Sequence, residues 1–218
     1  MIRNNSSLQR QTFDMLQKKF PGKEVAPHFL RTEVVLKNNI NKYKFDHRSV
    51  GGESSTEIKL DRNDLVYVTS ILLGWIECSE GEEAVASIKT YAPAGSDLEA
   101  LYNGFMSLKT GSKVNFEALS CQNFKYVPQQ QEEYKTAILG PSGTPVQHDM
   151  HMLDQFNFMD AAYSGVEDIY LHGTKSHEIT VEYPTKANMS VEPSSGERKL
   201  VLILNGFIIK NGADALNK

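Results

Sequence analysis

The strongest chemical signature in this chain is a pair of histidines with a nearby carboxylate. His148 and His151 are three positions apart, and Asp154 follows three positions later. On a helix these side chains would share one face, and two imidazoles with one carboxylate can hold a transition metal. The preceding Pro145 argues against a helix, and the spacing lacks the glutamate of the HExxH zinc motif. We therefore expect ordinary surface histidines, with a metal-dependent enzyme as an alternative.

Other patterns that could carry catalysis are incomplete. His172 and His177 flank a polar turn, where we expect two exposed imidazoles, but they do not form the HxH pair of cupin enzymes. The glycine pairs lack the Lys-Ser/Thr of a phosphate loop, and no serine lies in a GxSxG elbow. Cys121 would need a histidine close in space to act as a nucleophile, so a structural thiol is expected. We predict no catalytic residue, no cofactor and no metal.

The elements that would position these residues begin with one helix. Ser6 or Ser7 can cap a helix that runs to about Phe20, and Pro21 follows it. The apolar side chains of this helix fall on one face: Leu8, Thr12, Met15, Leu16 and Phe20. This stripe could pack on the chain's own body or reach a neighbour, and the pattern alone does not separate the two. Pro27 is expected to close a short linker.

After Pro27 the pattern becomes that of β-strands. Apolar and β-branched runs predict about ten short strands, and Leu65–Ile76 is apolar enough to be covered on both faces. A hairpin is predicted with its loop at Thr110-Gly111-Ser112, and Gln129–Pro145 is expected to be a long surface loop. Asn205-Gly206 interrupts the last strand and indicates a tight hairpin or a bulge. The other strands are expected at Phe29–Leu36, Lys42–Asp46, Ala84–Tyr91, Phe124–Val127, Ile169–Leu171 and Glu178–Tyr183.

These elements predict an all-β fold, an antiparallel sandwich of jelly-roll type with an N-terminal amphipathic helix. An α+β fold is the alternative. We divide the chain into a basic helical arm, residues 1–27, and a β-sandwich domain, residues 28–218. The longest apolar runs are strand-sized, too short for a membrane helix. Basic residues interrupt the N-terminus where a signal peptide is apolar, so we expect the chain to stay in the cytoplasm of the cell that makes it. Two cysteines are too few for a disulfide scaffold.

Charge is divided unevenly along the chain. Residues 1–44 carry nine Lys and Arg against three Asp and Glu, whereas the remainder carries fourteen against twenty-four, which gives the net charge of −4. A basic arm on an acidic body is expected to meet an anionic partner, either phosphate, anionic lipid or an acidic neighbouring subunit. The candidate arm contacts are Arg3, Arg10, Lys18, Lys19 and Lys23. Basic residues spaced in this way contact phosphate groups and do not select bases.

Aromatic residues give a competing interpretation. Trp75, Phe105 and Phe116 alternate within predicted strands and are expected in the core. Four tyrosines fall in or near predicted loops and could contact another molecule: Tyr91, Tyr102, Tyr134 and Tyr163. Exposed tyrosines favour a β-sandwich module that binds carbohydrate or a host surface.

The segment Asp97–Pro128, with LRTEVVLKNN and LDRNDLVYVTSILLGW before it, resembles coat proteins of tailless bacteriophages. The shared layout is a basic N-terminal arm, an early strand that begins Arg-Thr-Glu, a tight hairpin and an aromatic-Val-Pro exit. The resemblance implies a jelly-roll capsid subunit, and the length fits a single barrel, or a minor or spike protein, better than a double barrel. Its partners would be copies of itself, other virion proteins and an anionic inner surface of nucleic acid or lipid. We therefore expect a non-enzymatic virion protein with no small-molecule substrate.

Overall fold

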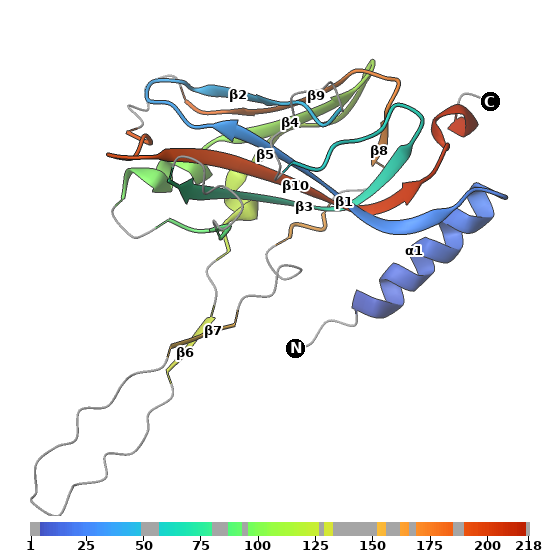
Figure 1. Ribbon diagram of the computed structural model, residues 1–218, viewed down its shortest axis with the longest axis horizontal. Coiled ribbons are helices and arrows are strands. Elements are labelled where there is room, and N and C mark those ends of the chain that lie inside the picture. The colour runs from blue at the N-terminus through green and yellow to red at the C-terminus, as the bar shows by residue number, and fades with distance from the viewer. Residues whose placement is uncertain are drawn as a thin grey trace, which may run out of the picture.

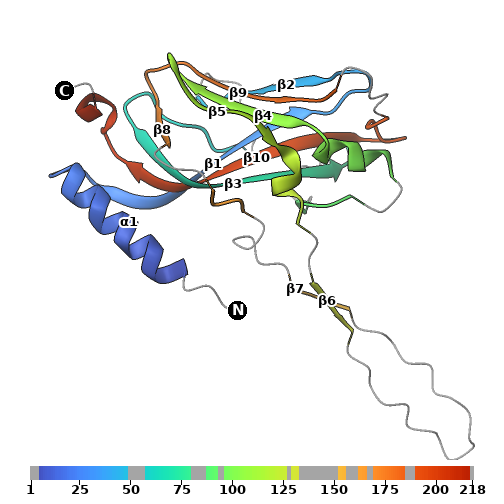
Figure 2. The same ribbon diagram turned by 180° about the vertical axis from the view of Figure 1, so that it is seen from behind.

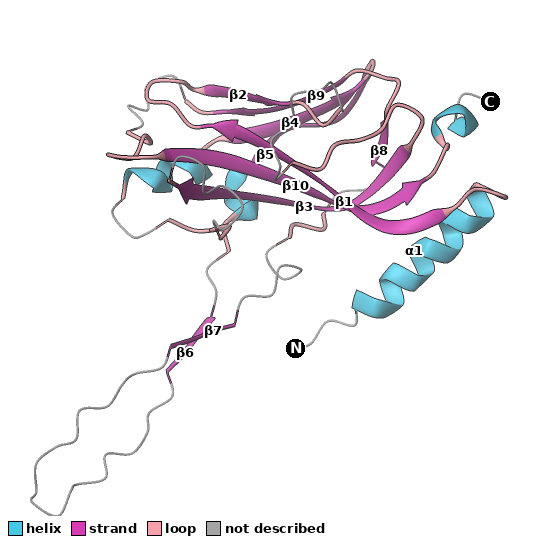
Figure 3. Cartoon of the chain, in the orientation of Figure 1, coloured by secondary structure: helices cyan, strands magenta, loops and turns pink. Residues whose placement is uncertain are grey.

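The fold is mostly β-structure, with one α-helix on the outside (Figures 1 and 3). The computed structural model describes residues 5–48, 57–79, 87–92, 96–126, 129–132, 152–155, 162–165, 169–184 and 190–216. Two four-stranded antiparallel sheets lie face to face, consistent with the expected β-sandwich. The first sheet has the order β1 (Val25–Val35), β10 (Glu197–Ile209), β3 (Leu65–Cys78) and β8 (Ile169–His172). The second has β2 (Lys42–Phe45), β9 (His177–Glu182), β4 (Phe105–Thr110) and β5 (Lys113–Ser120).

The main core lies between the sheets, where each strand directs alternate side chains inward. In β3 the inner positions include Val66, Ile71 and Trp75, and in β9 they include Ile179 and Val181. All five side chains are at most 2% exposed. The prediction that Leu65–Ile76 is a strand covered on both faces is confirmed, because Leu72 and Ile76 are buried on the outer face as well.

The outer face of the first sheet is covered in two places. Helix α1 (Asn5–Lys19) lies across one end, where Leu16 and Phe20 pack with Leu65, Phe207 and Ile209. At the other end Ile88, Tyr126 and Ala162 cover Leu72, Ile76, Val201 and Ile203. This double coverage explains why β3 and β10 are apolar along nearly their whole length.

The Asn205-Gly206 step is a β-bulge between β10 and β3. Asn205 pairs with Ser70 and Gly206 pairs with Val68, so Thr69 is an extra residue on β3. The Thr69 hydroxyl donates to the Asn205 carbonyl oxygen at 3.2 Å. A side chain at position 206 would collide with the carbonyl oxygen of Tyr67, so the bulge requires glycine. The bulge alternative is confirmed, and the hairpin alternative is wrong.

Several boundaries differ from the predictions. Pro27 does not close a linker but lies inside β1, which is an edge strand and can accept a residue without an N–H. The expected strand at Phe124–Val127 is wrong, since η3 (Cys121–Phe124) is a 3₁₀ turn there. Part of the expected loop at Gln129–Pro145 forms β6 (Gln129–Glu132), which pairs with β7 (Met152–Gln155). The β4–β5 hairpin is confirmed. Short 3₁₀ turns also occur at η2 (Asp97–Tyr102) and η4 (Ala213–Leu216).

Candidate interaction surfaces

Three basic residues of the arm, Arg10, Lys18 and Lys19, belong to helix α1, which is fixed to the sandwich. Leu16 is fully buried, whereas Leu8 is 62% and Met15 is 41% exposed, so only part of the predicted apolar stripe docks. Phe13, at 6.1 Å between ring centroids from Phe207, completes the contact. The helix therefore packs on the sandwich of its own chain, which was one of the two interpretations. It still leaves apolar side chains exposed on its surface.

The arm's cations are split between two sides of α1. Arg10 lines a hollow between α1 and β1, and Lys19 faces β8, where its ammonium donates to the Tyr170 hydroxyl at 3.0 Å. Lys18 and Lys23 are exposed to solvent, and Arg3 lies outside the described residues. Among the described residues, Arg10 and Lys19 therefore face different parts of the sandwich, and contact of the arm with an anionic partner stays a prediction.

The hollow beside Arg10 has a volume of about 660 Å³. Phe13, Phe29 and Phe207 supply much of its apolar wall, and Asn205 supplies an amide at the bulge. Its size is that of a small-ligand pocket, and its few polar groups suit an amphipathic occupant. Phe29 is 42% exposed, which leaves an aromatic ring at the rim.

Three sheet edges carry features that oppose open-ended strand addition. Along β1, Arg31 exchanges backbone hydrogen bonds with Ile58, which covers part of that edge. On β2 the outward side chains are Lys42 and Lys44. The β4–β5 register shifts twice along β5, and Ala118 has a φ of 56°. These irregularities twist β5 away from a flat edge.

The β6–β7 ladder is different, because it stands away from both sheets in the two views (Figures 1 and 2). Gln129 pairs with Gln155 and Glu132 pairs with Met152. A two-stranded ladder that packs on nothing else is at best marginally stable in water. This element is therefore the part of the described chain most in need of a partner.

A buried histidine cluster lies where β2, β8 and β9 meet. His47, His172 and His177 are 0%, 4% and 6% exposed, so the expectation of exposed imidazoles at 172 and 177 is wrong. The rings of His47 and His177 lie 4.7 Å apart, and His177 Nε2 is within 2.9 Å of the backbone of His172. Both ring nitrogens of His47 lack a hydrogen-bond partner within the described part of the chain.

Burial keeps these imidazoles neutral. Burial, with the neighbouring His177, lowers the pKa of His47 to about 3. Burial lowers the pKa of His177 to about 4, and burial and Lys175 also lower the pKa of His172. Sequence inspection missed His47 because it lies 125 or more residues from its partners in the chain. Only strand pairing brings them together.

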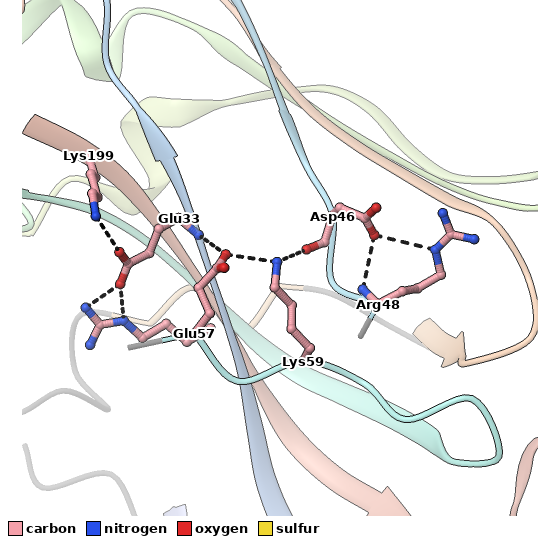
Figure 4. Close-up of polar contacts among 7 residues, drawn as sticks. Glu33, Asp46, Arg48, Glu57, Lys59 and Lys199 are labelled. Atoms are coloured by element: carbon pink, nitrogen blue, oxygen red, sulfur yellow. Dashed lines mark hydrogen bonds and ion pairs between the residues drawn. The ribbon is translucent and has the colours of Figure 1, made fainter. Parts of the chain in front are cut away.

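A chain of charged contacts connects the two sheets on the side of β1 (Figure 4). Glu33, with a side chain 3% exposed, accepts a hydrogen bond from Arg31 Nε at 2.9 Å and lies 3.7 Å from the ammonium of Lys199. Lys59 contacts Glu57 at 2.9 Å and also the backbone of Asp46. Removing one partner would leave an uncompensated buried charge. The network has cations beside each of its buried carboxylates, so we assign it a structural role.

The described residues contain no cluster of three or more His, Cys, Asp or Glu side chains placed to hold a metal. Asp154 lies on strand β7, so it does not have the helical setting that would align it with His148 and His151; both histidines lie outside the described residues. Metal binding by these three residues stays an alternative.

The structure shows how far the two cysteines and two of the candidate tyrosines are buried. Cys78 and Cys121 are buried and are not joined in a disulfide, and burial raises the pKa of the Cys121 thiol to about 12, which argues against a nucleophile. Tyr102, expected at the surface, is 1% exposed in the core, and Tyr163 packs on Phe124. Tyr134 lies outside the described residues.

Comparison with known proteins adds no relative. No family model matches the chain, and neither a curated protein nor a solved structure does. Within the described part of the chain, the single α-helix is too short and too polar to cross a membrane. Function must therefore be argued from the geometry.

Proposed function

We propose that the two sheets form a jelly roll. Without the inserted β6 and β7, the sandwich has eight strands. Their pairs run from the outside of the sequence inward: β1 pairs with β10, β2 with β9, β3 with β8, and β4 with β5. This is the pairing obtained when one long antiparallel hairpin is wrapped into two sheets, the arrangement of jelly-roll domains. Viral capsid proteins and lectins both use such domains.

We further propose that the protein is a virion structural subunit that self-assembles into the shell. The observation that carries this proposal is the β6–β7 ladder, which is inserted between β5 and β8 and stands off the sandwich (Figure 2). A projecting ladder gains stability when a second chain packs on it or extends it. In a closed symmetric assembly every copy both offers and receives this contact.

We expect the edges of the two sheets to contribute less to self-association than the β6–β7 ladder does. Lysines on β2 and bulges on β5 oppose strand addition there. The exposed Leu8 and Met15 on α1 offer an additional apolar contact. The partners would be copies of the chain, other virion proteins and, through the arm's cations, an anionic inner surface. Its location would be the virion.

The test is the size of the purified chain in solution, compared with a variant in which a short Gly-Ser linker replaces residues 129–155. Analytical ultracentrifugation and negative-stain microscopy should show rings or shells for the full chain. The variant should be monomeric, with an unchanged urea midpoint because the sandwich does not depend on the ladder. A full chain that stays strictly monomeric at high concentration would sink the proposal.

A carbohydrate- or host-surface-binding module is the second candidate, favoured by the aromatic hollow beside Arg10. Aromatic rings with a few amide and guanidinium donors suit a sugar. A glycan-array screen separates the two candidates, since a shell subunit should give no signal. The burial of Tyr102 removes part of the original support for this candidate.

A further inference from the structure

A second hollow lies between the β4–β5 turn and the strand β8 with the turn that follows it. Its volume is about 440 Å³. Strand pairing between Thr110 and His177 aligns the two turns, and the Gly111 N–H donates to the Ser176 carbonyl oxygen at 3.0 Å. The walls are therefore built on paired strands and on turns that are bonded to each other.

The charge of this hollow is of one sign. Lys113 and Lys175 line it, and its described lining contains no carboxylate. Neither lysine has a carboxylate within ion-pair distance in the described part of the structure. A third cation, Lys19, donates a hydrogen bond to the hydroxyl of Tyr170, and Tyr170 lines the hollow. The nearby Asp64 is occupied, because it pairs with Lys210 at 2.7 Å.

The neutral lining groups can donate hydrogen bonds. Thr110 accepts from the Asn115 amide at 2.7 Å, which leaves the Thr110 hydroxyl hydrogen free to donate elsewhere. Ser112 adds an exposed hydroxyl. His172 also lines the hollow, and its buried Nδ1 has no hydrogen-bond partner among the described residues. A nitrogen of a neutral imidazole that carries its hydrogen can donate to an oxyanion.

We propose that this hollow binds a phosphate or sulfate group, with Lys113 and Lys175 as the charged ligands and Thr110, Ser112 and His172 as hydrogen-bonding partners. A tetrahedral oxyanion accepts several hydrogen bonds at once, and ammonium groups are common partners for it. The volume exceeds what the oxyanion alone requires, so the group it is attached to would also enter. The site is independent of self-assembly and of the hollow beside Arg10.

Nucleotides, sugar phosphates and sulfated sugars all carry a phosphate or sulfate group, and a binding experiment with one member of each class separates these sources. Isothermal titration calorimetry on the full chain would use inorganic phosphate, inorganic sulfate, adenosine monophosphate, glucose 6-phosphate and glucose 6-sulfate. We expect saturable binding of the free ions. An organic ester that binds more tightly than the free ions would support the larger occupant and identify its source.

The matched variants remove charge from exposed side chains and should not affect folding. The double variant Lys113→Gln, Lys175→Gln is expected to weaken phosphate binding at least tenfold, because each substitution removes a charge-assisted hydrogen bond to the phosphate. Lys44→Gln, on β2 and outside the hollow, should bind as the unmodified chain does. The proposal is overturned by the absence of saturable binding, by equal competition from chloride, or by an equal loss in Lys44→Gln.

Discussion

At the scale of single residues, the most consequential group is the histidine cluster. His47 and His177 have folded-state pKa values of about 3 and about 4, below the ordinary 6.5. The unfolded chain therefore binds protons at pH values where the folded chain does not, and acid favours unfolding. The charged groups around the cluster are Asp46, Arg48, Lys59 and Lys175, and three of these four are cations that oppose protonation further.

The first prediction concerns pH and stability. The contribution of neutral His47 and His177 is complete above about pH 6.5 and is lost as the pH falls toward their folded-state values. At pH 5 each histidine should reduce the free energy of unfolding by about 2 kcal/mol relative to pH 7.5. Urea unfolding at a series of pH values measures this.

His47→Leu is the informative variant for that measurement. The imidazole has no hydrogen-bond partner among the described residues, so an apolar side chain of similar size should be tolerated near neutral pH. The loss of stability between pH 7.5 and pH 5 should be about 2 kcal/mol smaller in the variant. Titrating carboxylates affect both proteins and cancel in the comparison. An unchanged difference between the two pH values would contradict the assignment.

At the scale of elements, the second prediction separates the buried and exposed sides of α1. Leu16 is fully buried against the sheet, whereas the adjacent Met15 is 41% exposed. Leu16→Ala should lower the free energy of unfolding by about 2–5 kcal/mol, because it leaves a cavity under the helix. Met15→Ala should change it by about 0.5 kcal/mol or less. Equal effects in urea unfolding would mean that the helix is not docked in solution.

The elements show how far the sequence could be interpreted. Local patterns predicted α1, β3 and the β4–β5 hairpin, since each depends on neighbours in the chain. These local patterns gave wrong predictions where a residue distant in the chain determines the structure. Local rules predict that Pro27 closes a linker, but an edge strand accepts it because its missing N–H faces away from β10. The site residues give a second example. The sequence predicts an exposed His172 in a polar turn, but strand pairing buries it in the cluster that contains His47 and His177.

At the scale of the whole molecule, solubility depends on how the sheet edges are protected. The apolar outer face of the first sheet is covered by α1 at one end and by Ile88 and Tyr126 at the other. Edge strands still present unpaired backbone groups that can join another chain. On β2 the protection is electrostatic, since Lys42 and Lys44 point outward while Tyr43 and Phe45 point into the core.

The third prediction follows from this alternation. The double variant Lys42→Val, Lys44→Val keeps the core face of β2 and raises its strand propensity, so the fold should form. It removes both cations from an exposed edge and should produce irregular aggregates, detected as turbidity and by sedimentation. Lys18→Val with Lys23→Val, on α1 and just after it, removes the same charge without changing a residue of any strand. Aggregation of this control to the same extent would show that net charge, rather than the edge of β2, keeps the sandwich soluble.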